Sequence, residues 1–192
     1  MKGGLWCDGG VNAPASYQVA AEQAAGPSLL AGIVLVLATM TTGVITGVFG
    51  LYANTIMPGL GKTDDRTFVG AFQQIDRAII NPLFMTFFFG ALILTGLAGA
   101  LHLGAAGRRA LPWIAVAFAL YLVVVIITMA VNVPLNDAIK SAGAPDSISD
   151  LAQVRRDFDE ARWRAFNWVR VVLTTGSFAL LCVALLLNGR RR

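Results

Sequence analysis

Four long stretches of the sequence contain no Asp, Glu, Lys or Arg, and they limit the chain to a narrow class of folds. They cover residues 23–61, 78–107, 110–136 and 171–189. A helix needs roughly 20 apolar residues to cross the hydrocarbon core of a bilayer. Only 14% of all residues are charged, against about 25% in soluble domains. The pattern predicts an integral membrane protein whose main partner is the lipid bilayer. It excludes a soluble enzyme, a nucleic-acid-binding domain and a secreted disulfide scaffold.

Each span is expected to follow the apolar core of one stretch. The four expected spans cover residues 29–53, 82–103, 111–131 and 167–187. Short connections make successive spans antiparallel neighbours, so the predicted fold is an all-α, up-down-up-down four-helix membrane bundle. The bundle forms one domain over residues 29–187, after a mobile N-terminal segment (1–28) and before a basic tail (188–192).

The two longer connections are expected to carry short amphipathic helices. Phe68, Phe72, Ile75 and Ile79 recur at helical spacing over residues 66–80, which predicts one apolar face. Gln73, Asp76 and Arg77 are expected on the opposite, polar side. A second charged helix is expected from residue 147 to 164, running straight into the fourth span. Pro58 and Gly59 are expected to end the first span, because Pro and Gly interrupt helices.

The orientation follows from Lys and Arg residues in short segments beside the spans. Arg108 and Arg109 form a tight turn, and three arginines end the chain. We therefore expect a multi-pass protein of a bacterial cell membrane with both termini in the cytoplasm. A homo-oligomer remains an open alternative.

The expected threading brings polar side chains to the loop end of the bundle, which is the end that carries the two longer connections. They are Tyr52, Asn54, Asn81, Asn132, Asn136, Asn167 and Arg170. Polar groups near lipid are costly and often mark a function. The alternatives are hydrogen bonds that join helices and, for Arg170, an interface anchor that extends toward water.

Two spacings sharpen this expectation. Trp163, Asn167 and Arg170 fall on one stripe of the fourth span. Asn132 and Asn136 share a side if the third helix continues past Val131, whereas a break at Pro134 would leave Asn132 as a cap. The sequence has one histidine, His102, which is expected at the interface of the opposite end. Because metal sites draw on several ligands, we expect no metal and no cofactor.

Several short elements around these polar residues form a recognisable pattern. They are residues 47–52 with Met57-Pro58-Gly59-Leu60, then Asp65, Phe68 and residues 79–84, then Asn132-Val133-Pro134-Leu135-Asn136, and finally Arg156, Phe158, Trp163, Asn167 and Arg170. Over about residues 30–187 the chain resembles the anthrone oxygenase family of small four-span membrane proteins. The resemblance implies a four-helix bundle that oxidises an anthrone to an anthraquinone with molecular oxygen, without a metal or flavin.

An anthrone has an acidic methylene group, so such an enzyme needs hydrogen-bond donors for an enolate oxygen and a base. Arg170, Asn167, Asn136 and Asn132 are the predicted catalytic donors. The side chains predicted to bind the flat substrate are Tyr52, Asn81, Phe84, Trp163 and Trp168. No base stands out, because Asp65, Asp76 and Asp137 are all expected in loops; Tyr52 or water is the remaining choice.

Two other functions fit the same residues. The first is a non-enzymatic membrane protein that binds a lipid or another hydrophobic small molecule, or serves as an accessory subunit of a membrane complex. The second is a small transporter or channel. The sequence disfavours this second alternative, since no span contains a carboxylate and no inverted repeat is visible.

Overall fold

The computed structural model describes residues 29–189, and every regular element within them is a helix. The predicted N-terminal segment (1–28) and the last three residues of the basic tail lie outside the described residues. Four long helical rods form the bundle. They comprise α2 (Leu29–Leu51) with η1 (Tyr52–Ile56) and α3 (Met57–Leu60); α5 (Pro82–Leu101); α6 (Leu111–Ile127) with η3 (Thr128–Asn132) and α7 (Val133–Ser141); and α9 (Glu160–Gly189).

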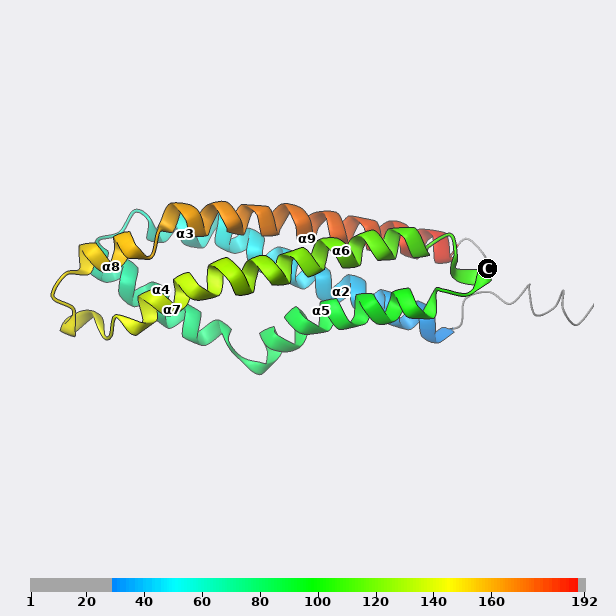
Figure 1. Cartoon of the computed structure of the whole chain (residues 1–192), viewed down its shortest axis with the longest axis horizontal. Coiled ribbons are helices and arrows are strands. Elements are labelled where there is room, and N and C mark those ends of the chain that lie inside the picture. Colours follow the sequence, from blue (N-terminus) through cyan, green and yellow to red (C-terminus); the bar gives the residue numbers. More distant parts are fainter. Residues whose placement is uncertain (1–28, 190–192) are drawn as a thin grey trace, which may run out of the picture.

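Shorter elements connect the rods. They are α4 (Asp65–Ile79), η2 (Ala105–Gly107), η4 (Pro145–Ser147) and α8 (Leu151–Asp157). Figure 1 shows that α4, α7 and α8 gather at one end, the loop end. The start of α2 and the end of α9 lie at the other end, which we call the turn end.

The rods are packed in a ring, in which each helix contacts the two neighbours that the threading predicts. Helix α2 packs against α5 and α9, and α6 packs against α9 and α5. The four rods are each long and apolar enough to cross a membrane. Large apolar side chains on their outer surfaces, such as Leu37, Ile93, Ile126 and Val172, are exposed. The predicted multi-pass four-helix membrane bundle is therefore confirmed.

The first and third rods extend beyond their predicted ends. Helix α5 has 20 residues and is about 30 Å long, which matches the hydrocarbon thickness. The first rod continues to Leu60 instead of ending near residue 53, and the third continues to Ser141 instead of 131. Both rods therefore project past the apolar layer at the loop end, where they frame the connecting helices.

Two π-helical turns explain how these rods continue through proline. A proline inside an α-helix lacks the backbone N–H and clashes with the carbonyl one turn earlier. Pro58 follows the turn η1 and Pro134 follows η3 at the same spacing. In each turn the backbone bond spans five residues, from Met57 N to the Tyr52 carbonyl in the first. The wider turn leaves room for the proline ring.

The fourth rod has a break that the sequence did not predict. The connecting helix begins at Leu151 and ends at Asp157, so it does not run straight into the span. Asp159 has a φ of 50°, a left-handed conformation that Asp tolerates better than most residues. Its side chain then accepts a hydrogen bond from the backbone N–H of Arg162. Asp159 thus caps α9 and sets its direction at the loop end.

Helix α4 has a broader buried face than predicted. Asp64 caps it by accepting hydrogen bonds from the hydroxyl and the backbone N–H of Thr67, and these bonds lower the pKa of the Asp64 carboxyl. Gln73 and Asp76 were expected on the polar side, but both are buried. The reason is that α7 and the loop after it cover this side. The amide of Gln73 donates to the carbonyl of Ile139 at 2.8 Å.

Candidate functional site

Arg170 is the most unusual side chain of the loop end, because it is a buried cation without an acid partner. It is 4% exposed, and none of the ion pairs within residues 29–189 includes it. Its Nη2 donates to Asn167 Oδ1 at 2.8 Å and its Nη1 to Thr128 Oγ1 at 3.3 Å. Its Nε has no protein partner. Arg170 does not extend to water, so its reading as an interface anchor is wrong.

Aromatic rings replace the missing acid partner. The Arg170 guanidinium lies 4.3 Å from the ring centroid of Phe49 and 5.4 Å from that of Trp163. Such contacts stabilise a cation, and more strongly where water is excluded. The positive charge therefore stays in the interior with donor capacity left over for a ligand.

Asn167 fixes the position of this guanidinium. Its Nδ2 donates to the carbonyl of Phe49 at 3.2 Å, while its Oδ1 accepts from Arg170. Phe49 lies just before the π turn η1, and π turns leave carbonyls available to side chains. Trp163, Asn167 and Arg170 are all buried, so the predicted stripe on the fourth span does face the interior.

The third rod places both asparagines beside Trp163. Asn136 accepts from Trp163 Nε1 at 2.7 Å, and Asn132 Nδ2 donates to the Trp163 carbonyl at 3.3 Å. Of the two predicted alternatives, the continuous helix is correct and the capping role of Asn132 is wrong. The Oδ1 of Asn132 is buried and has no protein partner. It is a second polar atom available to a ligand.

Asp76 is a site residue that the sequence analysis missed. Its Oδ1 accepts from Asn136 Nδ2 at 2.6 Å, and its Oδ2 lies 2.8 Å from Lys140 Nζ. Lys140 also pairs with Asp137 at 3.0 Å. A carboxylate thus enters the interior of the loop end, with a lysine and an asparagine as partners.

These side chains surround a cavity of about 120 Å³. One water molecule occupies roughly 10–15 Å³ of such space, so the cavity holds a group much larger than water. Most of its wall is apolar. The polar atoms come from Tyr52, Asp76, Thr128, Asn132, Asn136, Trp163 and Arg170. The apolar wall includes Phe49, Phe72, Ile75, Ile79, Phe84, Met85, Phe88 and Val133.

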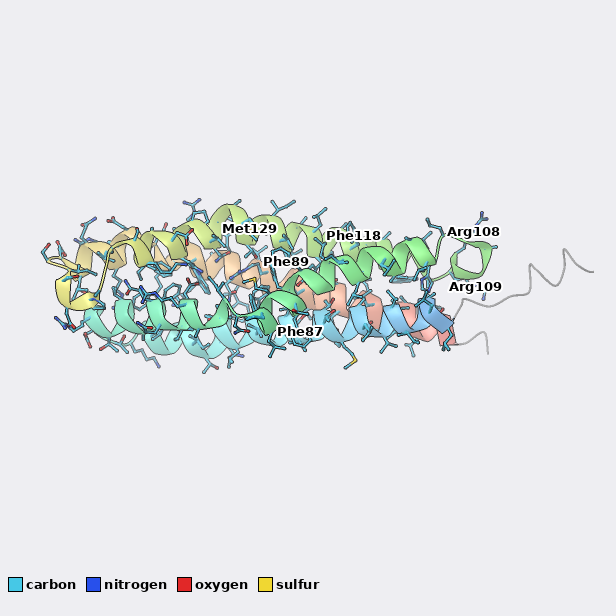
Figure 2. All side chains as sticks on the ribbon, turned by 90° about the horizontal axis from the view of Figure 1, so that it is seen from below. Phe87, Phe89, Arg108, Arg109, Phe118 and Met129 are labelled. Atoms are coloured by element: carbon cyan, nitrogen blue, oxygen red, sulfur yellow. The ribbon has the colours of Figure 1, made fainter. Side chains whose placement is uncertain are left out.

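The mouth of the cavity is formed by exposed apolar side chains. Ile80 is 55% exposed, Phe89 37% and Met129 47%, and all three line the cavity. Figure 2 shows Phe89 and Met129 on neighbouring helices, α5 and η3, on one side of the bundle. Phe89 lies about 10 Å along α5 from its first residue. The mouth is therefore an apolar opening on the outer surface of the bundle, while Asp76 and Arg170 are buried.

The structure separates the nine predicted site residues into three groups. Those that line the cavity are Tyr52, Phe84, Asn132, Asn136, Trp163 and Arg170. Asn167 lies behind the wall and holds Arg170. The other two lie elsewhere: Asn81 caps α5 by accepting from Phe84 N, and Trp168 is exposed on the outer surface of α9. Within residues 29–189, no three His, Cys, Asp or Glu side chains are grouped as metal ligands.

Comparison with known protein families identifies the family of this chain. The sequence model described as "Anthrone oxygenase" matches residues 84–180. The chain belongs to the anthrone oxygenase family. No curated protein and no solved structure matches it.

The match covers only part of the cavity of this anthrone oxygenase family member. It begins at Phe84 and includes Asn132, Asn136, Trp163 and Arg170. The α2 rod and α4 precede the matched region, so Tyr52 and Asp76 lie outside it. The roles of these two residues must therefore be argued from the geometry of this chain alone.

Proposed function

We propose that the cavity binds a flat, lipid-soluble aromatic ketone of the anthrone type, and that the protein oxidises it with molecular oxygen. The observation that carries this proposal is the buried Arg170 guanidinium, which has no acid partner and an unused Nε in an aromatic-walled cavity. A cation fixed in a dry site stabilises an oxygen atom on which negative charge develops. Membership of the anthrone oxygenase family supports the same reaction.

The reaction needs little from the protein beyond binding, proton transfer and charge stabilisation. Loss of a methylene proton turns the ketone into an enolate, whose carbon reacts with oxygen. One anthrone and one dioxygen give one anthraquinone and one water, so atoms and electrons balance without another reductant. Arg170 holds the enolate oxygen, and the rings of Phe84 and Trp163, which line the cavity, pack against the planar substrate.

The position of the mouth agrees with a substrate that is dissolved in the bilayer. Ile80, Phe89 and Met129 present apolar surface to the lipid side. A polycyclic ketone and oxygen both concentrate in hydrocarbon, so they reach Arg170 without crossing the aqueous phase. The product leaves by the same route.

The decisive experiment is oxygen uptake by the purified protein with a simple anthrone as substrate. We expect saturable uptake with formation of equimolar anthraquinone, resistance to a metal chelator, and loss of uptake in Arg170→Ala and in Asn136→Ala. Each variant must keep the helical content and thermal unfolding of a folded protein. Full activity in both variants would place the site elsewhere.

The same experiment addresses the alternative function. Uptake no faster than the autoxidation of anthrone, from well-folded wild-type protein, would favour a non-enzymatic protein that binds a hydrophobic ligand through the lipid-facing mouth. Anthraquinone binding measured by quenching of tryptophan fluorescence would then test the cavity directly, because Trp163 lines it.

A further inference from the structure

We propose that Asp76 is the proton acceptor of this cavity, and that Lys140 is a positioning residue that holds its carboxylate in place. This inference rests on the proposed function and supplies the base that the reaction requires. Among the described residues, Asp76 is the carboxylate that lines the cavity with Arg170. The two charged groups come from different elements, α4 and α9.

The surroundings of Asp76 show how a carboxylate is maintained in the interior. Burying a carboxylate is costly unless it is paired and hydrogen-bonded. Lys140 lies 2.8 Å from Oδ2, and Asn136 donates to Oδ1. Each carboxylate oxygen has two acceptor positions, so these partners leave capacity for a proton from a ligand.

The neighbouring charged groups define a path from the cavity to water. Asp76 is buried, Lys140 is partly buried and Asp137, its second partner, is largely exposed. Tyr52 of η1 interacts electrostatically with both Asp76 and Arg170. On α4 itself, the nearest charged side chain, Arg77, is exposed. Lys140 is therefore the cation that contacts Asp76, whereas Arg170 is left for the substrate oxygen.

The proton steps balance with oxygen as the only oxidant. The methylene C–H bond breaks, its proton moves to Asp76, and the electron pair spreads onto the ketone oxygen beside Arg170. Oxygen then bonds to the carbon, and the peroxide formed takes the proton back from Asp76. In the last step Asp76 removes the remaining proton on that carbon as the O–O bond breaks. The departing hydroxide takes that proton from Asp76 and leaves as water.

The first step can be measured without oxygen. Wild-type protein in lipid nanodiscs is incubated anaerobically with anthrone in heavy water, and deuterium at the methylene carbon is followed by mass spectrometry. We expect exchange faster than in buffer. Asp76→Asn should lower the protein-dependent rate by about 10²–10⁴-fold, the usual contribution of a general base. The variant should still bind anthraquinone, as measured by quenching of tryptophan fluorescence.

Lys140 is tested by the rate of the same anaerobic exchange. Lys140→Met removes the cation that pairs with the carboxylate, so the protein-dependent exchange rate should fall. Lys140→Arg should restore most of the wild-type rate, because it restores the charge. Asp137→Asn is the matched control: it removes a carboxylate that contacts the same lysine but does not line the cavity, and it should change the exchange rate less than twofold.

The outcomes separate this inference from the proposed function. If Asp76→Asn exchanged deuterium and consumed oxygen at the rates of the wild type, the role of Asp76 would be overturned and the proposed oxygenase function would stand. Loss of anthraquinone binding in that variant would make Asp76 a structural residue and also overturn the inference. An unchanged exchange rate in Lys140→Met would overturn the role of Lys140. Absence of both exchange and uptake in the wild type would overturn the proposed function and this inference together.

Discussion

Among the described residues, each end of the bundle buries one basic side chain, but the two side chains have different surroundings. At the loop end, Arg170 lies in a cavity with aromatic walls and keeps one donor without a protein partner. At the turn end, His102 is fully buried and follows the last residue of α5. Its Nδ1 donates to the carbonyl of Ala98 at 2.7 Å, while its Nε2, like Arg170 Nε, has no protein partner. His102 thus lies at the end of the bundle where it was expected, but its side chain is buried within the protein.

Residue size accounts for this difference. The core of the turn end contains small side chains that let the rods approach closely, such as Ala38, Ala98, Ala117 and Ala184. At the loop end, large rings such as Phe49, Phe72 and Trp163 line the cavity instead. Both ends leave a buried nitrogen without a protein partner, but at the loop end a cavity brings a ligand within reach of it. Burial alone thus does not identify a site; burial beside usable space does.

The largest expected effect comes from removing the Arg170 charge at the loop end. Arg170→Met keeps much of the side-chain volume and should lower kcat by about 10²–10³-fold, the usual cost of losing an oxyanion donor. Its unfolding temperature should stay the same or rise, because a desolvated charge without an acid partner contributes little to stability. Anthrone-dependent oxygen uptake and circular dichroism melting measure the two effects.

The matching variant at the turn end is His102→Gln. It should leave kcat and KM unchanged, even if the variant protein unfolds at a lower temperature. A loss of turnover in His102→Gln that equals the loss in Arg170→Met would contradict the assignment of function to the loop end alone.

The second prediction tests how tightly the turn end is closed. A Cβ on Gly107 would clash with the backbone of His102, so Gly107→Ala must displace backbone. We expect a loss of about 1–3 kcal/mol in the free energy of unfolding, as for other overpacked sites. Gly104→Ala is the control, because its Cβ would meet no atom within 4 Å; its effect should stay within about 0.5 kcal/mol. Equal effects of the two variants would show that the turn is not tightly packed.

The fold was predictable because it depends on features that are local in the sequence. Charge-free stretches give the spans, and helical spacing correctly placed Trp163, Asn167 and Arg170 on one inner stripe. The exact rod ends were not predictable, since proline is compatible with either a helix end or a π turn. Pro58 was accordingly expected to end a span and Pro134 left two alternatives open, whereas both helices continue through their proline.

The sequence did not predict Asp76 as the base, for a different reason. Asp76 lies one helical turn from both Phe72 and Ile79, at the border of the apolar face of α4. An acid in that position normally faces solvent. What buries it is α7, whose Asn136 is 60 residues away in the sequence. A partner that distant leaves no local signal, so the site became complete only in three dimensions.

The third prediction concerns the mouth of the cavity at the loop end. Met129→Trp places a larger ring beside Phe89 and should raise KM for anthrone about tenfold, or about 1.4 kcal/mol, with little change in kcat. Met40→Trp is the control, because Met40 is also exposed on the outer surface, on α2, but does not line the cavity. If KM were unchanged in Met129→Trp, the substrate would enter by another route.

The smallest expected effect separates a helix cap from a binding residue at the loop end. Asn81 accepts from Phe84 N at 3.0 Å and donates to the Ala78 carbonyl at 2.9 Å, so it caps α5 and joins it to α4. Asn81→Ala should cost about 0.5–2 kcal/mol of stability without changing KM. Asn81→Asp keeps a capping oxygen and should retain most of the stability. A rise in KM at unchanged stability would instead support the substrate contact that the sequence predicts for Asn81. The substrate-binding region would then extend past the start of α5.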